Sequence, residues 1–321
     1  MPDVSDDLMP LRAVRAERAA EDIQRFELAH PDGDELPPFT PGAHVLVRTP
    51  IGLIRRYSLA NAPDERERYV IAVKREPEGE GGSRSLVDDT KPGDILEVSA
   101  PRNVFELAGN PVSYLFIAGG IGITPIRSMT RHLLHTGGKP FKLYYLSRTP
   151  EQTAFRDEFT GPDYRGKVVM HHDMGDVDRS LDLWPVLEKP KGMHLYCCGP
   201  RGLMEAVRDM TGHWSRAAVH FEDFGAGKAA HAANDKAFSV LLAKRGDRVE
   251  IPADKSMLET LRAHGCVIAS SCESGTCGSC RVGLVAGEPE HRDLVLSDHE
   301  RTREVIVCVS RAHSPELTLD L

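Results

Sequence analysis

The chain has 321 residues, of which 40% are hydrophobic and 27% are charged, the profile of an ordinary globular protein with two or three domains. Its formal net charge of −8 argues against general nucleic-acid binding, and no apolar run approaches the length of a membrane span. A signal peptide begins with basic residues followed by an apolar run, whereas the first residues of this chain are acidic. We therefore expect no signal peptide and a location in the reducing cytoplasm.

The first third of the chain predicts a small antiparallel β-barrel. Short strand-like runs are separated by turn signals such as Pro41-Gly42 and Lys91-Pro92-Gly93. This spacing of short strands is typical of barrels. The strands are expected at residues 25–28, 44–48, 56–59, 69–74 and 94–98.

The pattern changes near Pro111 to alternating strands and helices, which predicts a doubly wound parallel sheet. The apolar run at residues 114–118 is typical of a buried parallel strand. A Gly-Gly-Ile-Gly-Ile-Thr-Pro sequence follows at residues 119–125 and opens a predicted helix. Further strands are expected at residues 142–146, 167–171 and 194–198, and another helix at residues 201–210.

A small, polar stretch at residues 227–235 is predicted to be a linker. Residues 238–243 and 248–251 then resemble a hairpin. Ser256 and Glu259 have the spacing of a capping box, which predicts that a helix begins there.

Four cysteines in this last part carry the strongest chemical signal. Four residues separate Cys272 from Cys277, two separate Cys277 from Cys280, and Cys308 follows after a long run. This is the plant-type ferredoxin spacing of ligands to a 2Fe–2S cluster. A structural zinc usually takes its ligands from two short-spaced pairs, and disulfides need an oxidising compartment, so both alternatives fit the sequence less well.

Three other motifs are candidates for ligand binding. Arg55 and Tyr57 share one face of a predicted strand, where a ring and a guanidinium suit a flat anionic ligand, although a packed surface strand is the plainer interpretation. The Gly-rich turns at residues 79–83 and 119–125 could present backbone amides to phosphates, or serve packing alone. Cys198-Gly199-Pro200 ends another predicted parallel strand, where such sheets place ligands.

With these motifs in this order, the chain resembles the phthalate dioxygenase reductase family over nearly its full length. The motifs that carry the likeness are Arg55-x-Tyr57-Ser58-Leu59, residues 119–125, Cys198-Gly199-Pro200, the Phe-Glu-Asp-Phe-Gly sequence of residues 221–225 and the cysteine loop. The resemblance implies an FMN-binding β-barrel at 1–110, an NAD-binding α/β domain at 111–226 and a 2Fe–2S ferredoxin domain of β-grasp fold at 236–321.

The resemblance also implies roles for single residues. Ser58, Thr124 and Phe224 would lie at the reacting flavin and nicotinamide rings, and Arg55 would hold the FMN phosphate. FMN would contact Arg55, Tyr57, Ser58, Leu59, Ala72, Val73, Lys74, Gly81, Gly82 and Ser83, while NAD would contact Gly120, Gly122, Thr124, Pro125, Cys198, Gly199 and Pro200. Ser147 and Arg148, after the strand at 142–146, could hold a ribose phosphate, although Arg148 could equally be a surface residue.

One position departs from the family pattern. An arginine often stands in the family loop where this chain has Glu80. A carboxylate beside a phosphate weakens the hold on it. Either Glu80 points to solvent, or FMN binds less tightly than the resemblance implies.

The implied activity is that of an NADH-dependent reductase that passes electrons from NADH to FMN, to the 2Fe–2S cluster and to the terminal oxygenase of a Rieske-type, phthalate-type dioxygenase in aromatic hydrocarbon catabolism. Alternatives are the reductase of another mononuclear-iron oxygenase or of an O-demethylase. A ferredoxin-like redox-binding module is the alternative from another class. The oxygenase is expected to dock around Glu273, Ser274 and Gly275, and neither nucleic acid nor a membrane is expected as a partner.

Overall fold

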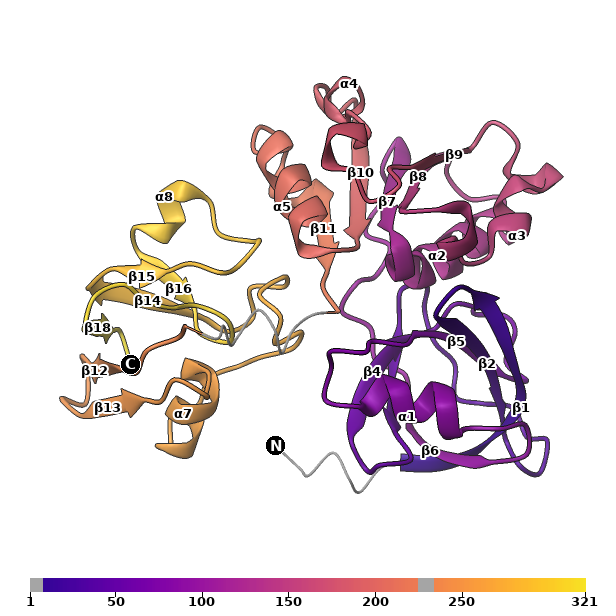
Figure 1. Cartoon of the computed structure of the whole chain (residues 1–321). Helices are drawn as coiled ribbons and strands as arrows, with labels where there is room; N and C mark the ends of the chain where they lie inside the picture. The colour runs from indigo at the N-terminus through magenta and orange to yellow at the C-terminus, as the bar shows by residue number, and fades with distance from the viewer. Residues whose placement is uncertain (1–7, 225–233) are drawn as a thin grey trace. The chain divides into compact units, whose positions relative to one another are not determined.

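The computed structural model describes residues 8–224 and 234–321 (Figure 1). The chain divides into two compact units, one formed by Met1–Leu203 with Ala217–His220 and the other by Met204–Arg216 with Phe221–Leu321. In the described ranges, none of the helices has the length and apolar character needed to span a bilayer.

The first unit begins with an antiparallel barrel. Its six strands are ordered β4-β3-β6-β1-β2-β5, and the end strands β4 and β5 also lie against each other, which closes the sheet. Side chains from alternate positions fill the interior, since successive residues of a strand face opposite sides. The elements are β1 (Leu8–Ala20), β2 (Ile23–Ala29), β3 (His44–Arg48), β4 (Ile54–Ser58), β5 (Tyr69–Lys74), α1 (Gly82–Asp89) and β6 (Ile95–Ser99).

The predicted barrel is confirmed, but two of its elements are absent from the prediction. In the strand β1 the buried face is marked only by Leu11 and Ala13, because the next positions are the exposed Val14 and Arg15 and the chain continues with small or charged, partly buried residues. The helix α1 follows directly from the Gly-rich turn, with Leu86 as its buried anchor. A helix of eight residues that begins with Gly82 and ends with two aspartates gives too little periodicity to be recognised.

The predicted parallel sheet is ordered β11-β10-β7-β8-β9, and its strands β7 to β10 belong to the first unit, whereas residues of α5 from Met204 and of β11 from Phe221 are assigned to the second. The pairs β10–β7, β7–β8 and β8–β9 are all parallel. The chain adds strands on one side of β7 and then returns to add β10 on the other. The elements are β7 (Ser113–Gly119), α2 (Ile123–His135), β8 (Phe141–Ser147), α3 (Arg156–Thr160), β9 (Val168–His172), α4 (Trp184–Leu187), β10 (Met193–Cys198), α5 (Arg201–Met210) and β11 (Val219–Glu222).

Barrel and parallel sheet share one hydrophobic cluster within the first unit. Ile23 and Ala72 of the barrel belong to the same cluster as Phe116, Ile123 and Met129 of the sheet and α2. Burial of such apolar surface stabilises the arrangement by roughly 25 cal/mol per Å². The two parts therefore form one packed body.

The second unit contains a mixed sheet ordered β13-β12-β18-β14-β16. The predicted hairpin is confirmed by the antiparallel pairing of β12 with β13, and the predicted capping box of Ser256 and Glu259 begins α7. The strand β18 runs parallel to β12 and packs the last residues of the chain into the core. The elements are β12 (Phe238–Leu242), β13 (Arg248–Ile251), α7 (Met257–Ala263), β14 (Arg281–Ala286), β15 (Pro289–Glu290), α8 (Asp298–Arg301), β16 (Glu304–Ile306), β17 (Arg311–Ala312) and β18 (Glu316–Leu319).

The predicted linker at 227–235 lies mostly outside the described residues. Its last residue, Asp235, is described and is held by the guanidinium of Arg292, with Nη1–Oδ2 at 3.0 Å. Arg311, almost fully buried, donates to the carbonyl oxygens of Lys236 and Pro252. Two arginines therefore fasten the start of the second unit to its own sheet.

Candidate functional site

The two glycine-containing turns of the parallel sheet meet at the carboxyl ends of β7 and β10. A Cβ atom on Gly122 would lie 2.2 Å from the carbonyl oxygen of Cys198, and one on Gly199 would lie 2.9 Å from the Cα of Gly119. Only glycine allows this approach. Since the strand order reverses between β7 and β10, this is the topological switch point where such sheets bind ligands.

The first of these turns leads directly into the N-terminus of α2. Gly120 has a φ of +53°, a conformation that favours glycine, and α2 begins three residues later. The Thr124 hydroxyl donates to the carbonyl oxygen of Ile121 at 3.1 Å and is buried. Thr124 thus shapes the turn, and the N-terminal end of α2 favours an anion such as a pyrophosphate. The structure brings the predicted NAD residues Gly120, Gly122, Thr124, Pro125, Cys198, Gly199 and Pro200 into this one region.

The predicted flavin residues lie on β4, on β5 and at the start of α1. Ser58 is buried at the end of β4, and burial raises the pKa of Tyr57 to about 12, so its hydroxyl stays protonated. On β5, the side chains of Ala72 and Val73 face opposite ways. Ala72 packs in the cluster shared with α2 and Val73 packs in the barrel core, and their contact with the flavin stays a prediction.

Arg55 and the start of α1 form a compact site for an anion. A Cβ on Gly82 would lie 3.2 Å from Arg55 Nε, so the guanidinium stem passes directly over the first turn of the helix. Gly81 precedes the helix with a φ of +94°. The Ser83 hydroxyl accepts a hydrogen bond from the Glu76 amide at 3.1 Å and braces the loop. A helix N-terminus beside an arginine is the usual protein setting for a phosphate.

The Glu80 side chain is largely exposed, but its carboxylate also forms an ion pair with Arg55 Nη2. The side chain of Glu80 is 78% exposed and that of Arg55 34% exposed. The carboxylate therefore occupies one donor that a flavin phosphate would use. The pairing supports the second of the two sequence-based alternatives, weaker phosphate binding.

We expect Glu80→Gln to tighten FMN binding by up to roughly fivefold, the scale of one exposed ion pair. The reason is that the amide no longer competes with a phosphate dianion for Arg55. Titration of the flavin-free protein with FMN, followed by quenching of flavin fluorescence, measures the change. Glu78→Gln removes the same charge from an exposed neighbouring position and serves as the control. Equal tightening in both variants would show that net charge alone matters.

The remaining predicted residues differ in exposure: Ser147 is buried, whereas Arg148, Lys74 and Phe224 are exposed. The Ser147 hydroxyl is buried between Thr153 Oγ1 at 2.7 Å and His172 Nδ1 at 3.0 Å, so it has no free face for a ribose phosphate. Arg148 is exposed and Lys74 is exposed. Phe224, 37% exposed, ends the described part of the first stretch, and its position beside a flavin stays a prediction.

The four cluster cysteines lie in the second unit, three of them on one loop. Gly275 and Gly278 have φ values of +74° and +75°, which turn backbone amides toward the sulfurs. The Ser274 amide donates to Cys272 Sγ at 3.4 Å, and the Cys272 amide donates to Cys277 Sγ at 3.5 Å. Amide donors of this kind stabilise thiolate charge and tune a cluster's potential.

The thiols approach one another in two pairs. A hydrogen bond with Cys277 lowers the pKa of Cys272 to about 4, and the same bond together with burial raises the pKa of Cys277. Cys280 and Cys308 show the same division, with the pKa of Cys280 lowered and that of Cys308 raised by their mutual bond. Within residues 8–224 and 234–321, no three or more His, Cys, Asp or Glu side chains gather as one metal ion would require. Two thiol pairs fit a cluster of two irons.

The docking surface stays a prediction, but the three residues expected there differ in exposure. Glu273 is exposed, whereas Ser274 is fully buried and Gly275 is buried too; of the four cysteines predicted as ligands, Cys277 is the exposed one. A Cβ on Gly275 would meet Val309 at 2.7 Å, because the loop folds inward at this point. The cluster site therefore comes closest to solvent at Cys277, which follows the predicted trio.

Sequence reasoning missed two residues that support the sites. The side chain of Asp293 has no exposed surface and accepts a hydrogen bond from the Leu296 amide at 2.7 Å. In the same turn, the Leu294 amide donates to the carbonyl oxygen of Gly275 and so joins the turn to the cluster loop. Arg127 is buried on α2 and donates to the carbonyl oxygen of Ala60 at 2.6 Å. Arg127 acts across 67 positions of sequence and the turn of Asp293 meets a loop that lies earlier in the chain, so no local pattern marks these roles.

Comparison with known proteins matches three family models in chain order. They are an oxidoreductase FAD-binding domain at residues 10–107, an oxidoreductase NAD-binding domain at 116–209 and a 2Fe-2S iron-sulfur cluster binding domain at 241–313. These ranges fall inside the three predicted domains, whose limits stay predictions. The chain is thus an oxidoreductase with flavin, NAD and 2Fe–2S domains.

Two relatives match along almost the whole chain. The phthalate 4,5-dioxygenase oxygenase reductase subunit of Pseudomonas putida is 53% identical over 99% of this chain and 98% of that protein. The phthalate dioxygenase reductase of Burkholderia cepacia is 52% identical over 98% of both. A solved structure of a phthalate dioxygenase reductase, described as modular for electron transfer from pyridine nucleotides to [2Fe-2S], matches 99% of both chains with 51% identity and a TM-score of 0.72. With the motifs, the fold and the paired thiols in agreement, this chain belongs to the phthalate dioxygenase reductase family.

Proposed function

We propose that this chain is the NADH-dependent reductase component of a Rieske-type, phthalate-type aromatic-ring dioxygenase and that its flavin is FMN. The observation that carries the proposal is the match over 99% of the chain to a reductase subunit of phthalate 4,5-dioxygenase. The seven cysteines are all free in the described residues, which suits a reducing compartment, and we place the protein in the cytoplasm.

The chemistry divides between cofactors and protein. A flavin held between β4, β5 and the start of α1 would supply the change from two-electron chemistry with NADH to one-electron chemistry with a 2Fe–2S centre. The protein's own residues bind and orient. The turn at Gly122 holds the nucleotide, Ser58 and Thr124 line the meeting point of the rings, and the four cysteines hold the irons.

FMN rather than FAD is supported by the site at Arg55. A terminal phosphate monoester carries nearly two charges and offers three oxygens, which match one guanidinium and the amides at the start of α1. NADH rather than NADPH is supported by Ser147, because its hydroxyl is committed to Thr153 and His172. Arg148 alone would then remain to bind a 2′-phosphate.

Reconstitution with a purified phthalate-type terminal oxygenase tests the proposal. We expect heat extraction of the purified reductase to release FMN, and NADH to support oxidation of phthalate at least tenfold better than NADPH. The mixture without the reductase is the control. Extracted FAD would overturn the flavin assignment. Dye reduction by NADH without any transfer to the oxygenase would overturn the partner.

A further inference from the structure

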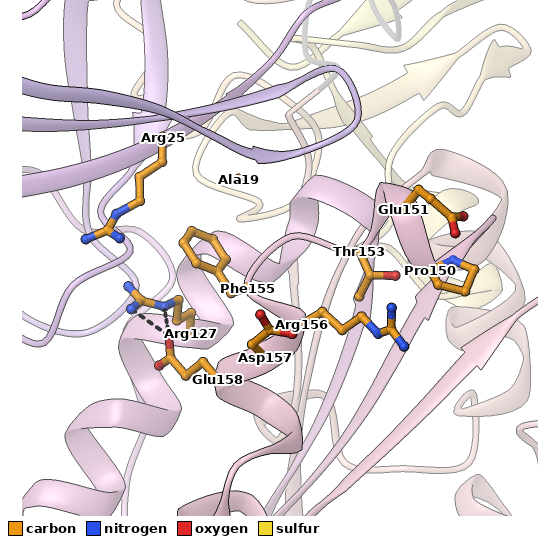
Figure 2. Close-up of a pocket in the computed structure, with 10 residues that line it drawn as sticks. All are labelled: Ala19, Arg25, Arg127, Pro150, Glu151, Thr153, Phe155, Arg156, Asp157 and Glu158. Atoms are coloured by element: carbon orange, nitrogen blue, oxygen red, sulfur yellow. Dashed lines mark hydrogen bonds and ion pairs between the residues drawn. The ribbon is translucent and has the colours of Figure 1, made fainter.

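The helix that begins at the nucleotide turn also carries a buried arginine that reaches the barrel. Arg127 lies on α2, and only 7% of its side chain is exposed. Its Nη1 donates to the carbonyl oxygen of Ala60 at 2.6 Å, and its Nε and Nη2 bind Glu158 Oε2 at 2.8 and 2.7 Å. Figure 2 shows the guanidinium with its dashed bonds to Glu158 and the ring of Phe155 beside it.

The two ends of this link are close in sequence to the predicted reacting groups. Ala60 stands two residues after Ser58, the last residue of the flavin strand β4. Thr124 stands three residues before Arg127, so both lie on one face of α2 within a single turn. A shift of the bond between Arg127 and Ala60 therefore moves the nucleotide turn relative to the flavin strand.

The guanidinium has little freedom to move. It lies 4.4 Å from the centroid of the Phe155 ring, and Phe155 itself has a φ of +57°, which is uncommon for a residue with a side chain. Glu158 also binds Arg131 Nη1 at 3.2 Å, and Arg131 Nη2 reaches Glu65 of the barrel at 2.6 Å. Two arginines of α2 and one carboxylate of α3 thus connect sheet and barrel.

Stability alone is a weak explanation for this arrangement. Burial lowers the pKa of the Arg127 guanidinium and disfavours its charge, and Glu158 only offsets this. Buried ion pairs are often no more stabilising than apolar residues of the same volume, because desolvation is costly. What a forked, planar guanidinium does provide is a fixed geometry between two partners.

We propose that Arg127 is a positioning residue that fixes the distance between the nicotinamide turn and the flavin strand through the carbonyl oxygen of Ala60. The proposal rests on the proposed function, since it concerns the step in which NADH reduces the flavin. Arg127 acts through α2 and β4 and touches neither ring. It is distinct from the barrel–sheet cluster, which supplies apolar burial without directional bonds.

Stopped-flow reduction of the FMN-loaded protein by NADH tests this directly. For Arg127→Met we expect the limiting rate of flavin bleaching to fall roughly 10- to 100-fold, the scale of an ångström-sized misplacement. The deuterium isotope effect with C4-deuterated NADH should rise, because the transfer step becomes fully limiting. Arg127→Lys should recover part of the rate, since an ammonium can bind Ala60 or Glu158 but cannot fork between them.

The control variant is Leu133→Ala, which removes a buried side chain from the same helix without touching the ion-pair network. It should lower the melting temperature and leave the limiting rate and the isotope effect unchanged. A cavity of about 380 Å³ adjoins Arg127 (Figure 2), so added guanidinium ion should raise the rate of Arg127→Ala but not of Leu133→Ala. If Arg127→Met fails to fold, the bleaching rates of Arg127→Lys and of Arg127→Ala with added guanidinium ion test the proposal instead.

Two results separate the possible failures. Wild-type protein that NADH does not bleach would overturn the proposed function. Wild-type protein that bleaches while Arg127→Met bleaches within twofold of it, with an unchanged isotope effect, would overturn the positioning role alone. A rate loss in Leu133→Ala as large as in Arg127→Met would also overturn it, because any destabilised α2 would then suffice.

Discussion

Replacing Cys308 with serine is expected to remove the 2Fe–2S cluster and to stop electron delivery to one-electron acceptors, while NADH still bleaches the flavin. Cys308 pairs with Cys280, so the change takes one of two ligands from one iron. Losing an outer hydrogen-bond partner of a metal ligand already costs roughly 10- to 100-fold in affinity, and losing a ligand costs more. Iron analysis, the visible spectrum and cytochrome c reduction measure the change.

Cys266→Ser is the matched control for this prediction. Cys266 lies in the same unit, is partly buried and belongs to neither thiol pair. We expect it to keep its iron and its activity toward cytochrome c. Full iron content in Cys308→Ser, or equal loss in the two variants, would contradict the assignment of the ligands.

The second large effect is expected from Gly122→Ala, which should slow flavin reduction by NADH about 100-fold. The added methyl would sit 2.2 Å from the Cys198 carbonyl oxygen and 2.8 Å from the Gly199 amide nitrogen, so the two turns of the nucleotide site must move apart. Dithionite needs no nucleotide site and should reduce the flavin of the variant as fast as that of the wild type. Stopped-flow absorbance with each reductant gives the comparison.

Gly212→Ala serves as the control for this substitution. A Cβ there would meet only the Asp209 oxygen at 3.8 Å, an ordinary contact. Its rate with NADH should equal that of the wild type. Slow reduction of Gly122→Ala by both reductants would mean that the flavin site itself is disturbed, and the placement of the nucleotide at this turn would lose its support.

Local patterns explain which parts of the fold could be predicted. The cysteine spacing, the capping box at Ser256 and the apolar strand before residue 119 each depend on neighbours within one element, and the structure has all three. The strand β1 and the helix α1 were missed because charged or glycine-rich positions hide their buried faces. Tertiary packing, not local periodicity, determines both.

The residues that surround the sites depend on long-range pairing. Sixty-seven positions separate Arg127 from Ala60, and 25 separate Arg55 from Glu80. A sequence shows the charges but not which of many opposite charges or carbonyl oxygens each one meets. The sequence could raise the question of Glu80, and the side-chain geometry was needed to show that its carboxylate pairs with Arg55.

Anaerobic titration with NADH, followed by visible and low-temperature EPR spectra, tests the central claim that electrons reach the cluster through the flavin. We predict that flavin absorbance bleaches first in rapid mixing and that the EPR signal of a reduced 2Fe–2S cluster then appears. The flavin-free protein should show no cluster signal with NADH but a full signal with dithionite. Cluster reduction by NADH without flavin, or zinc in place of iron in the reconstituted protein, would contradict the account.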